Sequence, residues 1–316
     1  KFRRCNPTAI IDYCCGIGGD MLALADVAPV LAVELSPIRA LLAARNAIHT
    51  THRWPALVVQ ADVATQFSRP QPGVVFHIDP ARRIGPKRSA EYSLMHPGPM
   101  VIQRVINVLQ DGAVKLSPAA DFSSLPDGHL ELISEDGVVV QAILWTGRMA
   151  QPMESGTHTA TVLSRRRSAW SLTGKPAAVA ILHEPQQWVF EIDGAVLRAG
   201  LSVALCAALG IQPISADGGY ATGPEAINHP ALTGFKIFGS LPYSQRAVAA
   251  ALRSKSSSAS SGKRAVVEVK TRGGLGLDTD KLSKSWSACT TRNCTVLIYR
   301  GVHGITAAIA EREIRE

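Results

Sequence analysis

The chain has 316 residues, 46% of them apolar, which is enough to bury a large core in two or three domains. It contains no uncharged apolar run of about 18 residues and no signal-peptide pattern, so we expect neither a membrane-spanning nor a secreted protein. Its six cysteines form no C-x-x-C pair, which predicts a reducing, cytoplasmic compartment and no zinc or other metal site.

The net charge of +8 is unevenly distributed along the chain. Residues 176–235 hold one arginine against five acids, a net charge of −4, whereas residues 236–300 hold twelve Lys and Arg against three acids, a net charge of +9. Such a basic segment predicts a surface for a polyanion. An ordinary solvated surface is the alternative that charge alone leaves open.

Residues 10–20, with the sequence IIDYCCGIGGD, form the first recognisable unit. An apolar strand containing Asp12 is followed by a turn with three glycines, and residues 21–25 are predicted to be helical. This strand–turn–helix arrangement is typical of nucleotide-binding corners in parallel α/β sheets. The dinucleotide pattern G-x-G-x-x-G requires a third glycine where this chain has Met21, which weighs against a nicotinamide cofactor.

Two further strands are also predicted to end in acids. Glu34 ends the second strand, 22 residues after Asp12, where its carboxylate could accept hydrogen bonds from a ribose diol or simply stabilise the start of the next helix. Asp62 lies at the end of the third strand. Because the carboxyl ends of parallel strands meet at one edge of a sheet, we expect these three acids to line one crevice.

The fourth strand ends at Asp79 and leads into a basic segment that begins at Pro80. Arginine planes there could stack on bases or bind phosphate, or the segment could be an ordinary solvated loop. His77 precedes Asp79 on the strand and is interpreted as a core or supporting residue, and His96 as structural. Lys115 on the fifth strand is expected either in the crevice or on the surface.

The elements predicted after the first turn fall into strands and helices that alternate, followed by a hairpin and a mixed C-terminal part. The predicted strands are 30–34, 57–63, 74–79, 113–118, 130–133, 138–145, 265–270 and a final strand at 294–300, and the predicted helices are 38–49, 100–109, 244–253 and 282–286. Residues 254–263 are serine-rich and are predicted to form a mobile loop.

Several segments resemble one bacterial protein family. The pattern D-x-x-C-G-x-G-G that starts at Asp12 resembles the first motif of class I S-adenosylmethionine-dependent methyltransferases, most closely the branch that modifies RNA and cap guanosines. Other segments resemble the members of that class that carry a C-terminal THUMP-like domain; they are Asp79–Arg83 (DPARR), Trp145–Gly147 (WTG), His183–Pro185 (HEP), Asp193–Leu201 (DGAVLRAGL) and Val267–Gly273 (VEVKTRG). Such methyltransferases carry helices before the first strand, so we expect the natural chain to begin earlier.

The resemblance implies an α/β fold in three parts. Residues 1–175 would be the class I methyltransferase sheet, residues 176–234 a small ferredoxin-like module, and residues 235–316 a THUMP-like domain. The implied cofactor is S-adenosylmethionine, which carries no phosphate, and Asp62 would accept from its adenine amino group.

The resemblance also implies roles for particular residues. The cofactor-binding residues would be Asp12, Cys14, Gly16, Gly18, Asp20, Glu34, Leu35, Asp62, Val63 and Asp79. The catalytic residues would be Asp79, Pro80 and Arg82, at the position where amine methyltransferases carry Asp/Asn-Pro-Pro-aromatic; Ala81 and Arg82 depart from that pattern. The substrate-binding residues would be Arg82, Arg83, Arg88, Lys263, Arg264, Lys270 and Arg272.

These interpretations predict an enzyme that transfers the cofactor's methyl group to a base nitrogen of rRNA or tRNA. Two alternatives remain: a methyltransferase acting on a small molecule or protein, and a non-catalytic RNA-binding protein that retains the cofactor pocket. The sequence does not specify the RNA, the base or the oligomeric state, nor whether the C-terminal part binds RNA.

Overall fold

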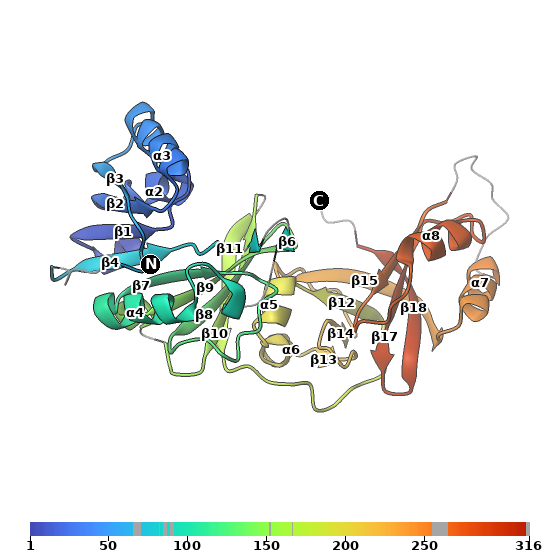
Figure 1. The fold of residues 1–316 in the computed structure, drawn as a ribbon. Helices are drawn as coiled ribbons and strands as arrows, with labels where there is room; N and C mark the ends of the chain where they lie inside the picture. The colour runs from blue at the N-terminus through green and yellow to red at the C-terminus, as the bar shows by residue number, and fades with distance from the viewer. Residues whose placement is uncertain are drawn as a thin grey trace. The chain divides into compact units, whose positions relative to one another are not determined.

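A computed structural model describes residues 1–65, 71–81, 83–84, 87–88, 92–151, 153–165, 167–254 and 265–313. The chain forms two compact units, which Figure 1 shows as ribbons. The first unit comprises residues 1–133 and 139–159, and the second comprises residues 134–138 and 160–316.

The first unit is built on a mainly parallel sheet in which the strand order is β8-β9-β7-β4-β1-β2-β3. Strands β3, β2, β1, β4 and β7 run parallel to their neighbours, and β9 pairs with β7 antiparallel. The strands are β1 (Ala9–Tyr13), β2 (Val30–Glu34), β3 (Ala56–Gln60), β4 (Val74–Ile78), β7 (Gly112–Leu116), β8 (His129–Glu135) and β9 (Val138–Thr146). A short two-stranded ladder, β5 (Arg83–Ile84) with β6 (Lys87–Arg88), follows β4.

Helices connect the parallel strands and cover the sheet. They are α1 (Phe2–Cys5), α2 (Gly19–Leu24), α3 (Pro37–His49) and α4 (Pro99–Leu109), with short 3₁₀ turns at Tyr92–Leu94 and Gly147–Met149. Helix α3 begins where Ser36 accepts a hydrogen bond from the Arg39 backbone N–H, and Pro37 occupies its first turn. It buries Ala40 and Ala43, small residues that let the helix approach the sheet closely.

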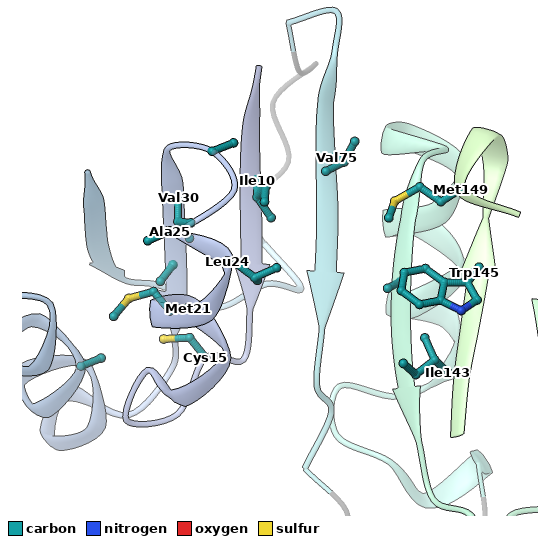
Figure 2. Packing of buried hydrophobic residues seen from close by; sticks show 14 residues of the cluster. Ile10, Cys15, Met21, Leu24, Ala25, Val30, Val75, Ile143, Trp145 and Met149 are labelled. Atoms are coloured by element: carbon teal, nitrogen blue, oxygen red, sulfur yellow. The ribbon is translucent and has the colours of Figure 1, made fainter. Parts of the chain in front are cut away.

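The core of this unit gathers where α2 packs on the sheet. Met21 and Leu24 of α2 lie beside Ile10 of β1 and Val30 of β2, and Trp145 of β9 belongs to the same cluster (Figure 2). Burying such side chains contributes about 1.5–3 kcal/mol each. The packing therefore holds the glycine turn between β1 and α2 against a rigid support.

The second unit contains a mostly antiparallel sheet with the order β13-β14-β12-β15-β18-β17-β16. The helices and strands from residue 158 onward are β10 (His158–Ser164), β11 (Arg167–Gly174), β12 (Trp188–Ile192), α5 (Gly194–Arg198), α6 (Ser202–Leu209), β13 (Gln212–Pro213), β14 (Tyr220–Gly223), β15 (Leu232–Pro242), α7 (Gln245–Ser254), β16 (Val267–Thr271), α8 (Thr279–Ser287), β17 (Cys294–Gly301) and β18 (Gly304–Arg312). In the described part of this sheet β16 and β17 pair in parallel, whereas the other pairs of neighbouring strands are antiparallel.

Strand β17 is buried on both faces of this sheet. Val296 and Ile298 face one cluster, with Trp286 of α8, while Leu297 and Tyr299 face another. Side chains alternate between the two faces of a strand, so a strand covered on both sides is apolar at every position. This explains the continuous apolar run at 296–299.

The predicted elements are largely present, with ends that differ by a few residues. The prediction of 294–300 as the final strand was wrong, because β18 follows it and pairs with both β17 and β15. The sequence of β18 (GITAAIAER) is rich in alanine, which is depleted in strands. Burial decides the outcome here, since Ala307, Ala308 and Ala310 are fully buried between neighbouring strands.

The compact units do not follow the predicted boundaries at residues 175 and 234. The second unit takes in residues from 160 onward, and β15 crosses position 234 while pairing with strands on both sides. The division into three modules, at residues 1–175, 176–234 and 235–316, therefore stays a prediction.

Candidate active site

A cavity of about 540 Å³ opens at the carboxyl ends of the parallel strands of the first unit. This volume lies within the range of small-molecule sites. The predicted residues that line it are Cys14, Gly16, Glu34, Leu35, Asp62, Val63, Asp79 and Pro80. The remaining lining residues, which the sequence did not single out for the site, are Val33, Arg39, Ala61, Ala81, His96 and Pro97.

The glycine turn forms the floor of the cavity. Gly16 has φ +59°, and a Cβ placed on it would meet no atom within 4 Å, so it would project into open space beside a ligand. Gly18 has φ +92°, and a Cβ there would lie 2.7 Å from Met21 Cε. Gly16 therefore leaves room for a ligand, whereas Gly18 permits the turn to pack on α2.

Glu34 fixes the turn from the end of β2. Its side chain is 4% exposed; Oε2 accepts from the Gly16 N–H at 2.9 Å, and Oε1 accepts from the Ser36 N–H at 2.9 Å and pairs with Arg39 at 3.1 Å. A carboxylate offers about four acceptor positions. A ribose diol would need two of them, and Arg39, with its half-exposed side chain, is the donor that can leave.

Asp62 and Asp79 are two further carboxylates that line the cavity. Asp62 Oδ1 accepts from the Ala64 N–H at 2.8 Å, which fixes the loop after β3. Asp79 follows β4, and its Oδ2 lies 2.8 Å from Lys115 Nζ, which also lies 2.7 Å from Asp20 Oδ2. Lys115 does not line the cavity, but it contacts Asp79, which does.

Asp12 lies beneath the cavity and does not line it. It is fully buried, and its Oδ1 lies 2.7 Å from Nδ1 of His77, its register partner on β4. Burial raises the pKa of Asp12, although the hydrogen bond from His77 acts in the opposite direction. Asp12 therefore has a buried supporting contact, and its part in cofactor binding stays a prediction, while His77 is the buried supporting residue that the sequence indicated.

Cys14 lines the cavity but is not a nucleophile. Burial, reinforced by the Glu34 carboxylate, raises its pKa to about 12, so it stays a thiol at neutral pH. All six cysteines of the chain are free thiols.

The charge of the cavity wall restricts the ligand. Three carboxylates (Glu34, Asp62 and Asp79) face one cation, Arg39, among the described lining residues. Such a wall disfavours the pyrophosphate of a dinucleotide and favours a ligand that carries positive charge. Positively charged groups, such as the sulfonium and ammonium of S-adenosylmethionine, suit such a wall.

Several predicted residues do not meet at this site or cannot be placed there. Gly18 and Asp20 lie next to the cavity without lining it. Arg82, Lys263 and Arg264 lie outside the described residues, as do the side chains of Arg83 and Arg88. In the second unit, Lys270 and Arg272 both contact the Glu191 carboxylate, at 2.8 and 3.0 Å.

Known proteins resemble the chain over nearly its whole length. An uncharacterised S-adenosylmethionine-dependent methyltransferase of Mycobacterium tuberculosis, found in strains CDC 1551 and H37Rv, is 28% identical over 315 residues, covering 95% of this chain and 79% of the relative. A Porphyromonas gingivalis W83 protein described as a methyltransferase shares the fold, with a TM-score of 0.68, 15% identity, and coverage of 98% of this chain and 78% of that one. No protein-family model matches the chain.

The chain is an S-adenosylmethionine-dependent methyltransferase. Its first unit is the class I methyltransferase-like region, and the second unit adds a mostly antiparallel sheet. No helix in the described part of the chain is long and apolar enough to cross a membrane. Within the same part, no group of three or more His, Cys, Asp or Glu side chains is placed to hold a metal ion.

Proposed function

We propose that this methyltransferase modifies a base nitrogen of RNA, with rRNA and tRNA as the substrate classes. The observation that supports this most directly is the position of Asp79 and Pro80 in the wall of the cofactor cavity, immediately after β4. A carboxylate and a backbone carbonyl side by side can accept two hydrogen bonds from a base amino group.

The cofactor supplies a methyl group on a positively charged sulfur. The chain's own contribution is to hold an acceptor nitrogen against it, since positioning two reactants can supply a large part of the barrier reduction. Asp79 uses Oδ2 for Lys115, which leaves Oδ1 to orient the acceptor and to offset the positive charge that develops on it. A base within a duplex would have to be extruded first.

The charge distribution adds support for a nucleic acid substrate. The segment after Pro80 carries Arg82, Arg83, Lys87 and Arg88, and residues 236–300 have a net charge of +9. As part of the same proposal, the second unit contains the ferredoxin-like and THUMP-like modules. This unit would dock the RNA. The protein would act in the cytoplasm. The Glu191 carboxylate contacts both Lys270 and Arg272, so it offsets part of the positive charge that these two side chains would present to a phosphate.

Methyl transfer from radiolabelled cofactor to separated bacterial fractions tests the proposal. We expect label in nucleosides from digested RNA, and none in the protein or small-molecule fractions. Asp79→Asn should lower the rate by about 100-fold, the size typical of removing one positioned polar group. Asp26→Asn, at an exposed carboxylate outside the cavity, is the matched control and should leave the rate unchanged. Label confined to protein or small molecules would refute the RNA assignment.

A further inference from the structure

Lys115 joins two carboxylates that come from different elements of the first unit. Its Nζ lies 2.7 Å from Asp20 Oδ2 in the first turn of α2 and 2.8 Å from Asp79 Oδ2 after β4. Lys115 itself is on β7, and its side chain is 20% exposed. Three separate elements thus converge on one ammonium group beside the cavity.

The contacts leave this triad incompletely paired. A lysine ammonium has three N–H donors, and the two aspartates use two of them. Among the described residues, no other partner is seen for the Asp20 and Asp79 carboxylates or for the ammonium. The triad has one positive and two negative charges, so it offers both a free donor and free acceptor oxygens.

The ammonium remains charged at neutral pH. Burial alone would lower the pKa of Lys115, but the hydrogen bonds to Asp20 and Asp79 outweigh it and raise the pKa. Both signs of charge are therefore present at the same place. A ligand group that carries an ammonium next to a carboxylate matches this arrangement.

The sheet places the triad away from the nucleoside residues. In the order β7-β4-β1-β2-β3, Lys115 is on β7 and Asp79 follows β4, whereas Glu34 ends β2 and Asp62 follows β3. The glycine turn after β1 lies between the two groups. Strands β7 and β2 are three spacings apart, about 14 Å, which gives room for a nucleoside joined to an amino-acid chain.

We propose that Lys115 is a specificity-determining residue that binds the α-carboxylate of the cofactor, while Asp20 receives the α-ammonium. Alternating charges make this arrangement favourable, since each group of the zwitterion meets its opposite. The inference rests on the cofactor and not on the RNA substrate.

Calorimetric titration with three adenosine ligands tests the inference. S-adenosylhomocysteine carries both the ammonium and the carboxylate, decarboxylated S-adenosylmethionine lacks the carboxylate, and methylthioadenosine lacks both. Lys115→Met should weaken S-adenosylhomocysteine by at least tenfold and leave methylthioadenosine within twofold. The decarboxylated ligand, which is cationic, should bind the variant equally well or more tightly.

Two further variants make the test specific. Asp20→Asn, at a partly exposed position, should weaken both amino-bearing ligands and spare methylthioadenosine. Lys236→Met, at an exposed lysine of β15, is the matched control and should change none of the affinities. Thermal melting of each variant checks that it is folded.

The outcomes are distinct. Equal weakening of all three ligands by Lys115→Met, or unchanged affinity for S-adenosylhomocysteine, would overturn the inference. Wild-type protein that binds none of the ligands would overturn it together with the cofactor assignment. A failure of RNA methylation would leave these affinities as they are, so it bears on the proposed substrate alone.

Discussion

The buried pair of Asp12 and His77 makes a quantitative prediction about stability. Both side chains are almost fully buried, with Asp12 1% and His77 7% exposed. The Nδ1 atom of His77 lies 2.7 Å from Oδ1 of Asp12. Asp12 Oδ2 is buried without a partner in the described structure. Removing His77 would therefore leave the carboxylate without a hydrogen-bond donor in an apolar interior.

We expect His77→Leu to lower the free energy of unfolding by about 3 kcal/mol at pH 8. A lost hydrogen bond to a charged group costs about 1.5–3 kcal/mol, and a buried charge left without its partner costs about 3–5 kcal/mol. The carboxylate can avoid part of this cost by taking up a proton. Stability should therefore depend on pH in a way that identifies the cause.

The direction of this pH dependence follows from the pKa of Asp12. Burial already raises this pKa in the folded state, and loss of the His77 hydrogen bond raises it further. A carboxyl whose folded pKa exceeds its unfolded value loses stability as pH rises through the folded value. The destabilisation by His77→Leu should thus be larger at pH 8 than at pH 5.

Urea unfolding of four proteins at pH 5 and pH 8 measures this effect. The double variant Asp12→Asn/His77→Leu has no buried charge, so its stability should lose the extra pH dependence and exceed that of His77→Leu at pH 8. His49→Leu, at an exposed histidine, is the control. Equal destabilisation of the single variant at both pH values would refute the reasoning, because a simple packing loss has no pH dependence.

Substitutions at His129 and in the glycine turn give independent checks on the first unit. Burial lowers the pKa of His129 to about 4, so stability should fall by up to about 3 kcal/mol as the pH drops from 6.5 to 4. His129→Gln should remove that part of the pH profile, and an unchanged profile would contradict the assignment. Gly18→Ala should cost about 1–3 kcal/mol in a urea titration because φ is +92°, whereas Gly19→Ala, without positive φ or a close contact, should cost less than 0.5 kcal/mol. Equal costs at the two glycines would contradict the role of the turn.

The sequence alone indicated most of the residues that line the cavity. Glu34, Asp62 and Asp79 end or follow consecutive strands, and parallel strands bring their carboxyl ends to one edge whatever the details of packing. The glycine turn could be recognised for a similar reason, because a positive φ close to a ligand nearly requires glycine. These features are encoded locally, by residue type and spacing.

Contacts between residues far apart in the sequence decided the partners of the charged side chains. Asp12 contacts His77, its neighbour on β4, and does not line the cavity. Lys115 meets Asp20 across 95 residues of sequence, and Glu191 engages Lys270 across 79. No local pattern specifies such pairs.

The same division explains why β18 was missed. Its alanines favour a helix by intrinsic propensity, but the pairing with β15 and β17 satisfies the backbone and buries the side chains. Propensity differs by less than about 1 kcal/mol per residue, whereas burial and pairing act on the whole strand. The sequence by itself thus determined the strand ends that form the cavity, and the tertiary structure decided which charges meet there.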